Sequence, residues 1–395
     1  MIDLDQAWAI VAREAKPLAT ERVALSDAHR RILSEAVVAL VDWPPADVSA
    51  MDGYAVRDAD PGPRRVVGQA FAGTGFAGTM GPGDCVRVFT GAPLPRGADR
   101  VVMQENVILD GDSVTLPAPN AGRRHIRQKA SDFGTGDLLL PAGRRLDALA
   151  MVVAAGADVA DVCVWRRPRV TILGTGDELV APGTARERSG TIPESVSFGV
   201  AALVEEWGGE TIQRLRLPDD LHAISGAAAN AVEQSDVVVV TGGASVGERD
   251  YSKAAFAAIG LASGFTKVAV KPGKPVWFGR VGGTLVLGLP GNPTSAMVMA
   301  RLLLAPLVAG MAGGDPADAA QWRTAILAEP LERCGDRETL VRAQRTGDMV
   351  RPLVNQDSAA QKALADSNCL IRQHVGSPPL VAGDVIEILD FWRAY

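Results

Sequence analysis

The stretch that decides the fold is Val-Val-Val-Val-Thr-Gly-Gly-Ala-Ser-Val-Gly-Glu-Arg-Asp-Tyr-Ser-Lys, residues 237–253. Four consecutive valines are too few for a separate helix and too apolar for a strand with one face in water. They therefore predict a strand buried on both faces of a parallel sheet covered by helices. A glycine-rich loop follows, and ligands of open α/β sheets bind beyond the carboxyl ends of the strands. Because Asp250 and Lys253 come next, we interpret the loop as an anion-binding site beside a carboxylate.

The composition limits the class of protein. The chain has 395 residues, with 22% charged and 47% hydrophobic residues, which predicts a folded protein of two to four domains. A formal net charge of −6 argues against a nucleic-acid-binding protein. The four cysteines have no paired spacing, which argues against a cysteine zinc site and fits a reducing compartment. Arg301 and Pro306 interrupt the longest apolar stretch, and the first residues lack the pattern of a signal peptide. We expect a cytoplasmic protein that does not span a membrane.

Changes of pattern along the chain predict its domains. Helical spacing over residues 3–15, 27–37 and 146–155 predicts an N-terminal helical, linking domain made of residues 1–41 and 142–166. Short β-rich runs between glycine and proline turns, including a run at 137–140, predict an inserted β-rich domain at 42–141.

Strands then alternate with helices over residues 167–312, and a strand is expected at 265–270. This alternation predicts an α/β domain with a mostly parallel sheet covered by helices. Residues 313–395 are again β-rich and predict a C-terminal β domain.

Four loops of the α/β domain carry chemistry. They are Leu173–Glu178, residues 241–250, the Lys-Pro-Gly-Lys-Pro turn at 271–275, and Leu289–Pro293. Lysines suit phosphate, and carboxylates suit Mg²⁺ rather than zinc. We therefore expect a phosphorylated or nucleotide-like ligand with a divalent metal at this edge. Taken alone, the acid pair Asp219–Asp220 is more simply explained as a helix N-cap.

The β-rich insertion holds a second group of polar residues. It includes Asp52 in the turn 49–56, Thr90 beside a proline-rich loop, and Asp132 after a cationic run at 123–129. Each of these is more often a turn or a solvated surface than a site. The four histidines are scattered, so neither a catalytic triad nor a histidine metal cluster is indicated.

Six motifs occur in a fixed order: Ser-Ala-Met-Asp-Gly-Tyr-Ala-Val (49–56), Thr-Gly-Ala-Pro-Leu-Pro (90–95), Gly-Thr-Gly-Asp-Glu-Leu (174–179), Gly-Gly-Ala-Ser-Val-Gly-Glu-Arg-Asp-Tyr (242–251), Lys-Pro-Gly-Lys-Pro (271–275) and Leu-Pro-Gly-Asn-Pro (289–293). Together they resemble the molybdopterin molybdenumtransferase family, which is related to the E domain of gephyrin. The resemblance covers essentially the whole chain. It implies four domains in an elongated homodimer, with an active cleft between the α/β domain and the partner's β insertion. The implied reaction inserts molybdate into adenylylated molybdopterin with Mg²⁺ and releases AMP and molybdenum cofactor.

The resemblance also assigns roles to individual residues. Residues implied in catalysis are Asp52, Thr90, Asp132, Glu178, Asp220, Asp250, Lys267 and Lys271. Glu178, Asp220 and Asp250 would also hold the metal. Residues implied in binding the pterin nucleotide are Gly174, Gly176, Asp177, Gly242, Gly243, Ser245, Gly247, Lys274, Pro290, Gly291, Asn292 and Pro293. Further implied partners are the adenylyltransferase upstream and molybdoenzyme chaperones downstream.

Three positions depart from the family's usual pattern. Val48 stands in place of a polar residue, Val196 in place of an asparagine, and Asp357 in place of a glycine. These departures leave an alternative open, a molybdopterin-binding or scaffolding paralogue with little turnover. A molybdopterin adenylyltransferase is a third and weaker alternative, because its reaction would not need the additional domains.

Overall fold

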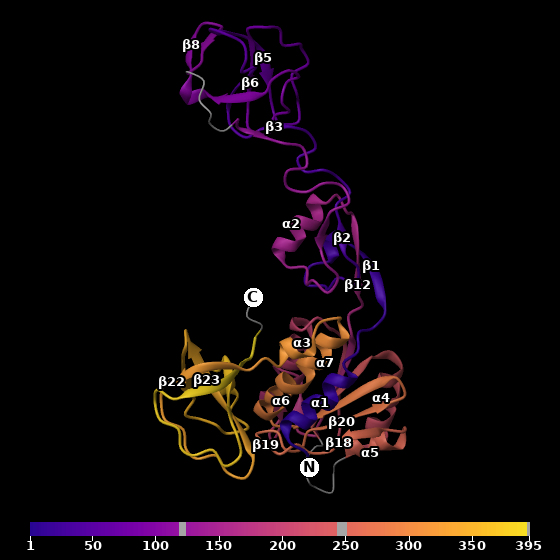
Figure 1. Ribbon diagram of the computed structural model, residues 1–395. Coiled ribbons are helices and arrows are strands. Elements are labelled where there is room, and N and C mark those ends of the chain that lie inside the picture. Colours follow the sequence, from indigo (N-terminus) through magenta and orange to yellow (C-terminus); the bar gives the residue numbers. More distant parts are fainter. Residues whose placement is uncertain (118–123, 243–250, 393–395) are drawn as a thin grey trace. The chain divides into compact units, whose positions relative to one another are not determined.

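The computed structural model describes residues 1–117, 124–242 and 251–392 (Figure 1). The chain divides into two compact units. Unit 1 contains residues 1–21, 30–34 and 163–395, and unit 2 contains residues 22–29 and 35–162.

A six-stranded sheet forms the centre of unit 1, with the order β16-β13-β17-β21-β20-β18. The first four strands are parallel, and β20 and β18 are added antiparallel, so the predicted mostly parallel sheet is confirmed. The strands are β13 (Arg169–Thr175), β16 (Glu210–Leu217), β17 (Val237–Thr241), β18 (Ala262–Phe265), β20 (Trp277–Val281) and β21 (Thr284–Leu289).

Helices cover both faces of this sheet (Figure 1). On one face lie α1 (Leu4–Glu14), α3 (Val196–Glu206) and a long helical stretch made of α6 (Pro293–Met299), a π-helical segment (Ala300–Leu304) and α7 (Ala305–Met311). On the other face lie α4 (Leu221–Gln234) and α5 (Tyr251–Ala258).

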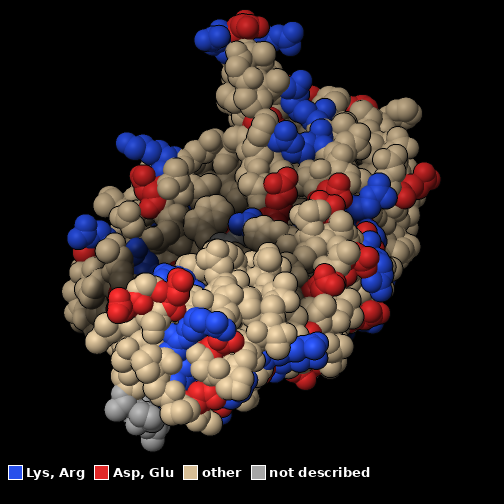
Figure 2. All heavy atoms as spheres, turned by 90° about the horizontal axis from the view of Figure 1, so that it is seen from above, with Lys and Arg blue, Asp and Glu red and all other residues tan. Residues whose placement is uncertain are grey.

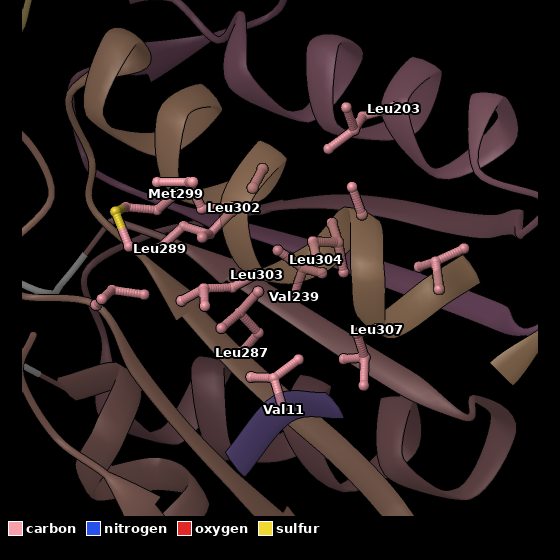
Figure 3. Packing of buried hydrophobic residues seen from close by; sticks show 14 of the residues in the cluster. Val11, Leu203, Val239, Leu287, Leu289, Met299, Leu302, Leu303, Leu304 and Leu307 are labelled. Carbon is pink, nitrogen blue, oxygen red and sulfur yellow. The ribbon is translucent and has the colours of Figure 1, made fainter. Parts of the chain in front are cut away.

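The valine strand is buried as its sequence predicts. Val237 and Val239 pack in the cluster below α3 and α7, whereas Val238 and Val240 pack in the cluster below α4 and α5. Figure 3 shows the first cluster, in which Val239 and Leu287 from the sheet meet leucines of the 300–307 stretch. The stretch 293–311 is long and apolar enough to cross a membrane, but 94% of its most apolar window is buried, as in the core helix of a globular domain.

The expected strand at 265–270 is wrong in its bounds. Phe265 ends β18, and the next strand, β19, contains only Val270 and Lys271. Between them the backbone bends, and Val268 forms an isolated parallel bridge with Ile2. The apolar pattern of this segment therefore reflects a buried isolated bridge rather than a continuous strand.

The C-terminal part of unit 1 is a β-barrel-like domain. Five strands close a ring, since β23 pairs with both β24 and β25, β25 with β26, β26 with β22, and β22 with β24. They are β22 (Arg323–Leu327), β23 (Glu338–Thr346), β24 (Met349–Pro352), β25 (Cys369–Gln373) and β26 (Val385–Asp390). The short helices α8 (Pro316–Ala319) and α9 (Gln361–Ala365) complete it, and β19 joins the edge of β23.

Unit 2 contains the predicted β-rich insertion as a second six-stranded sheet, with the order β7-β4-β6-β5-β9-β8. Its strands are β4 (Gly53–Val56), β5 (Arg64–Ala70), β6 (Asp84–Val88), β7 (Arg100–Met103), β8 (Ile108–Asp110) and β9 (Ser113–Thr115). Two small ladders join β3 (Val48–Ser49) to β10 (Ile126–Arg127), and β2 (Val37–Val38) to β11 (Leu138–Leu140). The predicted strand at 137–140 thus lies outside the six-stranded sheet. The unit also contains α2 (Ala148–Gly156), which begins after Asp147 as N-cap.

The expected helix at 27–37 is wrong. A single 3₁₀ turn, η1 (Leu25–Asp27), is followed by extended chain. Arg30 has a φ of 66°, outside the helical region, and the fully buried Leu33 forms an antiparallel bridge with Val164. Tertiary pairing therefore outweighs the local helical preference of these residues.

The remaining short elements are β1 (Thr20–Ala24), β12 (Asp161–Trp165), β14 (Leu179–Val180), β15 (Ile192–Pro193), η2 (Gln104–Asn106) and η3 (Ala185–Glu187). On the face drawn in Figure 2, the described basic and acidic side chains are interspersed over the surface. This mixture agrees with the net charge of −6 and gives that face no large area of one sign.

Candidate functional site

Three glycine loops meet at the carboxyl ends of β13, β17 and β21. These parallel strands are neighbours, so their loops leave the sheet side by side. Gly242 has a φ of 90°, and a Cβ there would lie 2.3 Å from the carbonyl oxygen of Thr175. A Cβ on Gly291 would lie 3.4 Å from the Cα of Gly242. We call residues 174–178, 242 and 290–293 the glycine edge; here a ligand can meet backbone directly.

The first loop of the glycine edge places a carboxylate over bare backbone. Gly176 has a φ of 154°, and a Cβ there would lie 2.9 Å from both carboxylate oxygens of Glu178. The Glu178 side chain is exposed, so its carboxylate folds back over Gly176 and still faces solvent. A larger residue at position 176 would displace it. The loop therefore needs glycine in order to hold this acid.

The second pair of acids lies beside this loop. The backbone N–H of Asp219 donates to the Asp177 carboxylate at 3.0 Å, which ties the loop after β16 to the glycine edge. Asp220 accepts a hydrogen bond from the N–H of Ala223 at 2.8 Å and caps α4. The N-cap interpretation of Asp220 is thus confirmed. Asp220 remains exposed, and its capping bond occupies one of its two oxygens.

The three lysines of the predicted site lie on and near one rigid turn. Lys267 is half-buried, whereas Lys271 and Lys274 are exposed. The peptide bond between Lys271 and Pro272 is cis, and Gly273 packs so closely that a Cβ would lie 2.4 Å from Met299. Within the described residues, none of these lysines forms an ion pair, so each positive charge remains available to an anion.

Arg342 is a polar residue near the site that the sequence analysis missed. It is fully buried on β23, and its Nη1 donates to Thr294 Oγ1, just after the glycine edge, at 3.2 Å. Its Nε and Nη2 have no hydrogen-bond partner among the described residues. Burial lowers the pKa of Arg342, and the nearby Asp357 acts in the opposite direction. The only sequence signal is an arginine inside the apolar run 340–343.

Segment 356–358 of the C-terminal domain contacts the glycine edge and the residue after it. Asn292 Nδ2 donates to Ser358 Oγ at 2.9 Å, and Thr294 N–H donates to the Ser358 carbonyl oxygen at 3.2 Å. Gln356 exchanges hydrogen bonds with the backbone of Arg342 at 2.9 and 3.0 Å. Segment 356–358 therefore holds Arg342 and the last loop of the glycine edge in one arrangement.

In unit 2 the structure brings Asp52 and Thr90 together. Asp52 Oδ1 accepts hydrogen bonds from Thr90 N at 2.7 Å and from Thr90 Oγ1 at 2.8 Å. The backbone bond from Thr90, and then the hydroxyl bond, lower the pKa of Asp52, so this half-buried acid is ionised at neutral pH. Asp132 is exposed and donates its N–H to the carbonyl oxygen of Trp43 at 3.1 Å. No described hydrogen bond joins Asp132 to Asp52.

For the predicted metal site, the structure shows candidate carboxylate ligands but no complete ligand cluster among the described residues. Among the described residues there is no cluster of three or more histidine, cysteine, aspartate or glutamate side chains. Glu178 and Asp220 supply two exposed carboxylates on loops joined by the hydrogen bond between Asp177 and Asp219. Magnesium keeps several waters and often takes only one or two carboxylates from the protein, so donors of this kind suit Mg²⁺.

Comparison with known proteins identifies the family. Residues 2–157 match the MoeA N-terminal region (domain I and II), residues 171–310 match a probable molybdopterin binding domain, and residues 324–391 match the MoeA C-terminal region (domain IV). A curated molybdopterin molybdenumtransferase of Haemophilus influenzae is 35% identical over 99% of both chains. Another from Staphylococcus aureus is 31% identical over 98% of this chain and 95% of its own.

The chain belongs to the molybdopterin molybdenumtransferase family of enzymes. A crystal structure of a molybdopterin biosynthesis MoeA protein from Pyrococcus horikosii has the same fold. It covers 100% of both chains with a TM-score of 0.83 and 27% identity.

Two departures from the pattern of the molybdenumtransferase family now have structural explanations. Val196 is the first residue of α3, 8% exposed, and packs in the hydrophobic cluster with Val200 and Leu203. Its side chain therefore belongs to the core. Val48 is also buried and pairs with Arg127 in the ladder between β3 and β10.

The predicted ligands Gly243, Ser245, Gly247 and Asp250 lie outside the described residues.

Proposed function

We propose that this protein inserts molybdenum from molybdate into adenylylated molybdopterin, with release of AMP and with assistance from Mg²⁺. The single observation that carries the proposal is the glycine edge, where Gly176, Gly242 and Gly291 follow three neighbouring parallel strands at closely packed positions where a Cβ would meet neighbouring atoms. Beyond them lie Lys267, Lys271 and Lys274, which form no described ion pairs. An anionic, flat substrate fits an edge of this kind, and the family membership supports a molybdopterin substrate.

The chain's own residues would bind charge and orient groups. Molybdate is a dianion, and the adenylyl link of the substrate carries negative charge. The three lysines, and from below the surface the buried guanidinium of Arg342, would stabilise that charge as it moves, and backbone amides of the loops would orient the phosphate. The protein needs no nucleophile of its own if an oxygen of molybdate attacks the adenylyl phosphorus.

Glu178 and Asp220 would hold Mg²⁺, together with Asp250 of the loop beyond β17. The metal would offset charge on the phosphate oxygens. Glu178 is suited to this task because its carboxylate is already fixed over Gly176 and exposed. Asp220 keeps one oxygen for this purpose, since its capping bond to Ala223 uses the other.

The test is release of AMP by purified protein given adenylylated molybdopterin, Mg²⁺ and molybdate. We expect molybdate-dependent release that is lost in Glu178→Ala and retained in the control Glu187→Ala, an exposed acid of the same domain. AMP transfer from ATP to molybdopterin without molybdate would instead identify an adenylyltransferase. Release that persists in Glu178→Ala would remove the proposed metal ligand from the mechanism.

We also propose that the enzyme is a cytoplasmic homodimer in which Asp52 of one protomer serves the glycine edge of its partner. Unit 2 exposes a set of apolar side chains that a dimer interface would cover: Val38 (39%), Leu40 (58%), Leu138 (62%), Leu149 (77%) and Val152 (71%). Asp52→Ala and Glu178→Ala proteins should each be inactive. Mixing equal amounts and letting subunits exchange should restore about a quarter of wild-type activity, because half of the dimers keep one intact site. No recovery on mixing would refute the shared site.

One observation favours the second candidate, a paralogue that binds the pterin but turns over slowly. Asp357 replaces a glycine of the family pattern, and its negative charge acts on the buried Arg342. The acid would offset the positive charge that Arg342 contributes near the site. Tight binding of adenylylated molybdopterin without AMP release, corrected by Asp357→Gly, would establish this alternative.

A further inference from the structure

An aromatic and cationic stack lies beside Asp52 in unit 2, and none of the motifs assigned above includes it. The rings of Phe71 and Phe89 are stacked, with centroids 4.7 Å apart and an angle of 7° between their planes. The guanidinium carbon of Arg87 lies 5.4 Å from the Phe89 centroid and 5.6 Å from that of Tyr54. We call Phe71, Phe89 and Arg87 the aromatic stack.

The strand register explains why these side chains meet. In the antiparallel pair of β4 and β6, Gly53 lies opposite Val88 and Tyr54 opposite Arg87. In the parallel pair of β5 and β6, Ala70 lies beside Val88. Phe71 and Phe89 are each one residue beyond the pair Ala70 and Val88. Since side chains alternate between the faces of a sheet, both rings lie on the face that carries Arg87 and Tyr54.

The same register brings the predicted catalytic acid to this face. Gly53 lies opposite Val88 in this antiparallel pair. The residue before Gly53, which is Asp52, therefore comes next to the residue after Val88, which is Phe89, on the shared face. Thr90, which donates both of its hydrogen bonds to Asp52, is the residue after Phe89. The aromatic stack is therefore adjacent to the pair Asp52 and Thr90.

Arg87 is held rigidly in this arrangement. Its Nη1 donates to the Tyr54 hydroxyl at 3.1 Å, and its Nη2 donates to Gln104 Oε1 at 3.0 Å. Tyr54 is itself 2% exposed and anchored in the core. A guanidinium held in this way is attracted to the ring of Phe89 and helps to fix that ring in the stack.

Phe71 is the open end of the stack. The residue is 45% exposed, so part of its ring is open to solvent. It lies at the base of a tight hairpin, where Phe71 and Thr74 exchange backbone hydrogen bonds at 2.9 and 3.0 Å. The backbone that presents the ring is thus fixed, and one ring face remains available to a planar group.

We propose that Phe71 stacks on a planar nitrogen heterocycle of the substrate, and that the aromatic stack is a ring-binding subsite beside Asp52. This inference rests on the proposed function, because adenylylated molybdopterin carries two such rings, an adenine and a pterin. Aromatic side chains stack on any such ring with little dependence on its edge groups. The role assigned to Phe71 is binding and positioning, with no part in bond making.

The experiment measures binding of AMP and, separately, of a free pterin to the full-length protein by calorimetry. Phe71→Leu should weaken binding of one of the two about tenfold, because stacking on a base contributes roughly this much to affinity. Phe71→Trp should keep the wild-type affinity. Phe76→Leu is the matched control, since Phe76 lies in the same segment but packs over Gly68 and Gly78, outside the stack. Thermal melts of each variant report whether the fold is intact.

A loss confined to AMP assigns adenine to the stack, and a loss confined to the pterin assigns the pterin. Equal affinities in Phe71→Leu and wild type for both rings would overturn the inference, as would wild-type protein that binds neither ring. An equal loss in Phe76→Leu would show that the effect is structural. Molybdate-dependent AMP release tests the proposed function independently, because a protein without turnover can still show the Phe71 effect on ring binding.

Discussion

Replacing Arg342 with methionine should separate stability from anion binding. The guanidinium is fully buried, makes one side-chain hydrogen bond of 3.2 Å to Thr294, and leaves Nε and Nη2 without partners among the described residues. Two unsatisfied buried donors cost about 2–6 kcal/mol, and one hydrogen bond from a charged group returns about 1.5–3 kcal/mol. Methionine has a similar length and carries no donors. We therefore expect Arg342→Met to leave stability unchanged or to raise it by about 1–3 kcal/mol.

The assay is thermal unfolding with and without molybdate. A dianion that binds only the folded wild type raises its midpoint as its concentration passes Kd. Arg342→Met should start from an equal or higher midpoint and lose this response. Arg351→Met is the control, because Arg351 is an exposed residue of the same domain, ion-paired with Glu329 at 3.0 Å. It should keep the molybdate response.

One result would refute this reasoning. If Arg342→Met lowers stability by more than about 1 kcal/mol and the variant still responds to molybdate, the arginine is a structural element of the barrel. Its unpaired nitrogens would then be satisfied in a way unrelated to substrate. Loss of stability together with loss of the response would be resolved by Arg342→Lys, which keeps the charge.

Three further outcomes are expected. Gly242→Ala should lose several kcal/mol of stability and all turnover, because Gly242 has a φ of 90° and a Cβ there would lie 2.3 Å from the carbonyl oxygen of Thr175. Urea unfolding measures the stability, and AMP release measures the turnover. The N–H of Thr135, together with other donors, lowers the pKa of Asp42 from 3.8 to about 2. The stabilisation is therefore complete above pH 3.8 and is lost as the pH falls towards 2, so Asp42→Asn should lower the thermal midpoint at pH 7 but not at pH 2. Thr90→Val removes one of the two bonds that lower the pKa of Asp52, and carboxyl NMR titration should show that pKa rising towards 3.8.

Local pattern carried a large part of the fold. The valine run, the glycines after it and the alternation of strands with helices predicted the α/β domain, because burial on two faces requires an apolar residue at every position of a strand. The same local signals failed at 27–37 and 265–270. There, isolated bridges formed by Leu33 and by Val268 bury residues at a spacing that resembles that of a helix or a longer strand.

By itself, the sequence determined which chemical groups the protein has and, through six ordered motifs, the family to which it belongs. Only the tertiary structure decided which of those groups meet. It placed Gly291 against Gly242, buried Arg342 beside Thr294, and stacked Phe71 on Phe89. These contacts join residues far apart in the chain through strand register and domain packing. Sequence periodicity reports only the environment of each residue along its own element, so it contains no information on such partners.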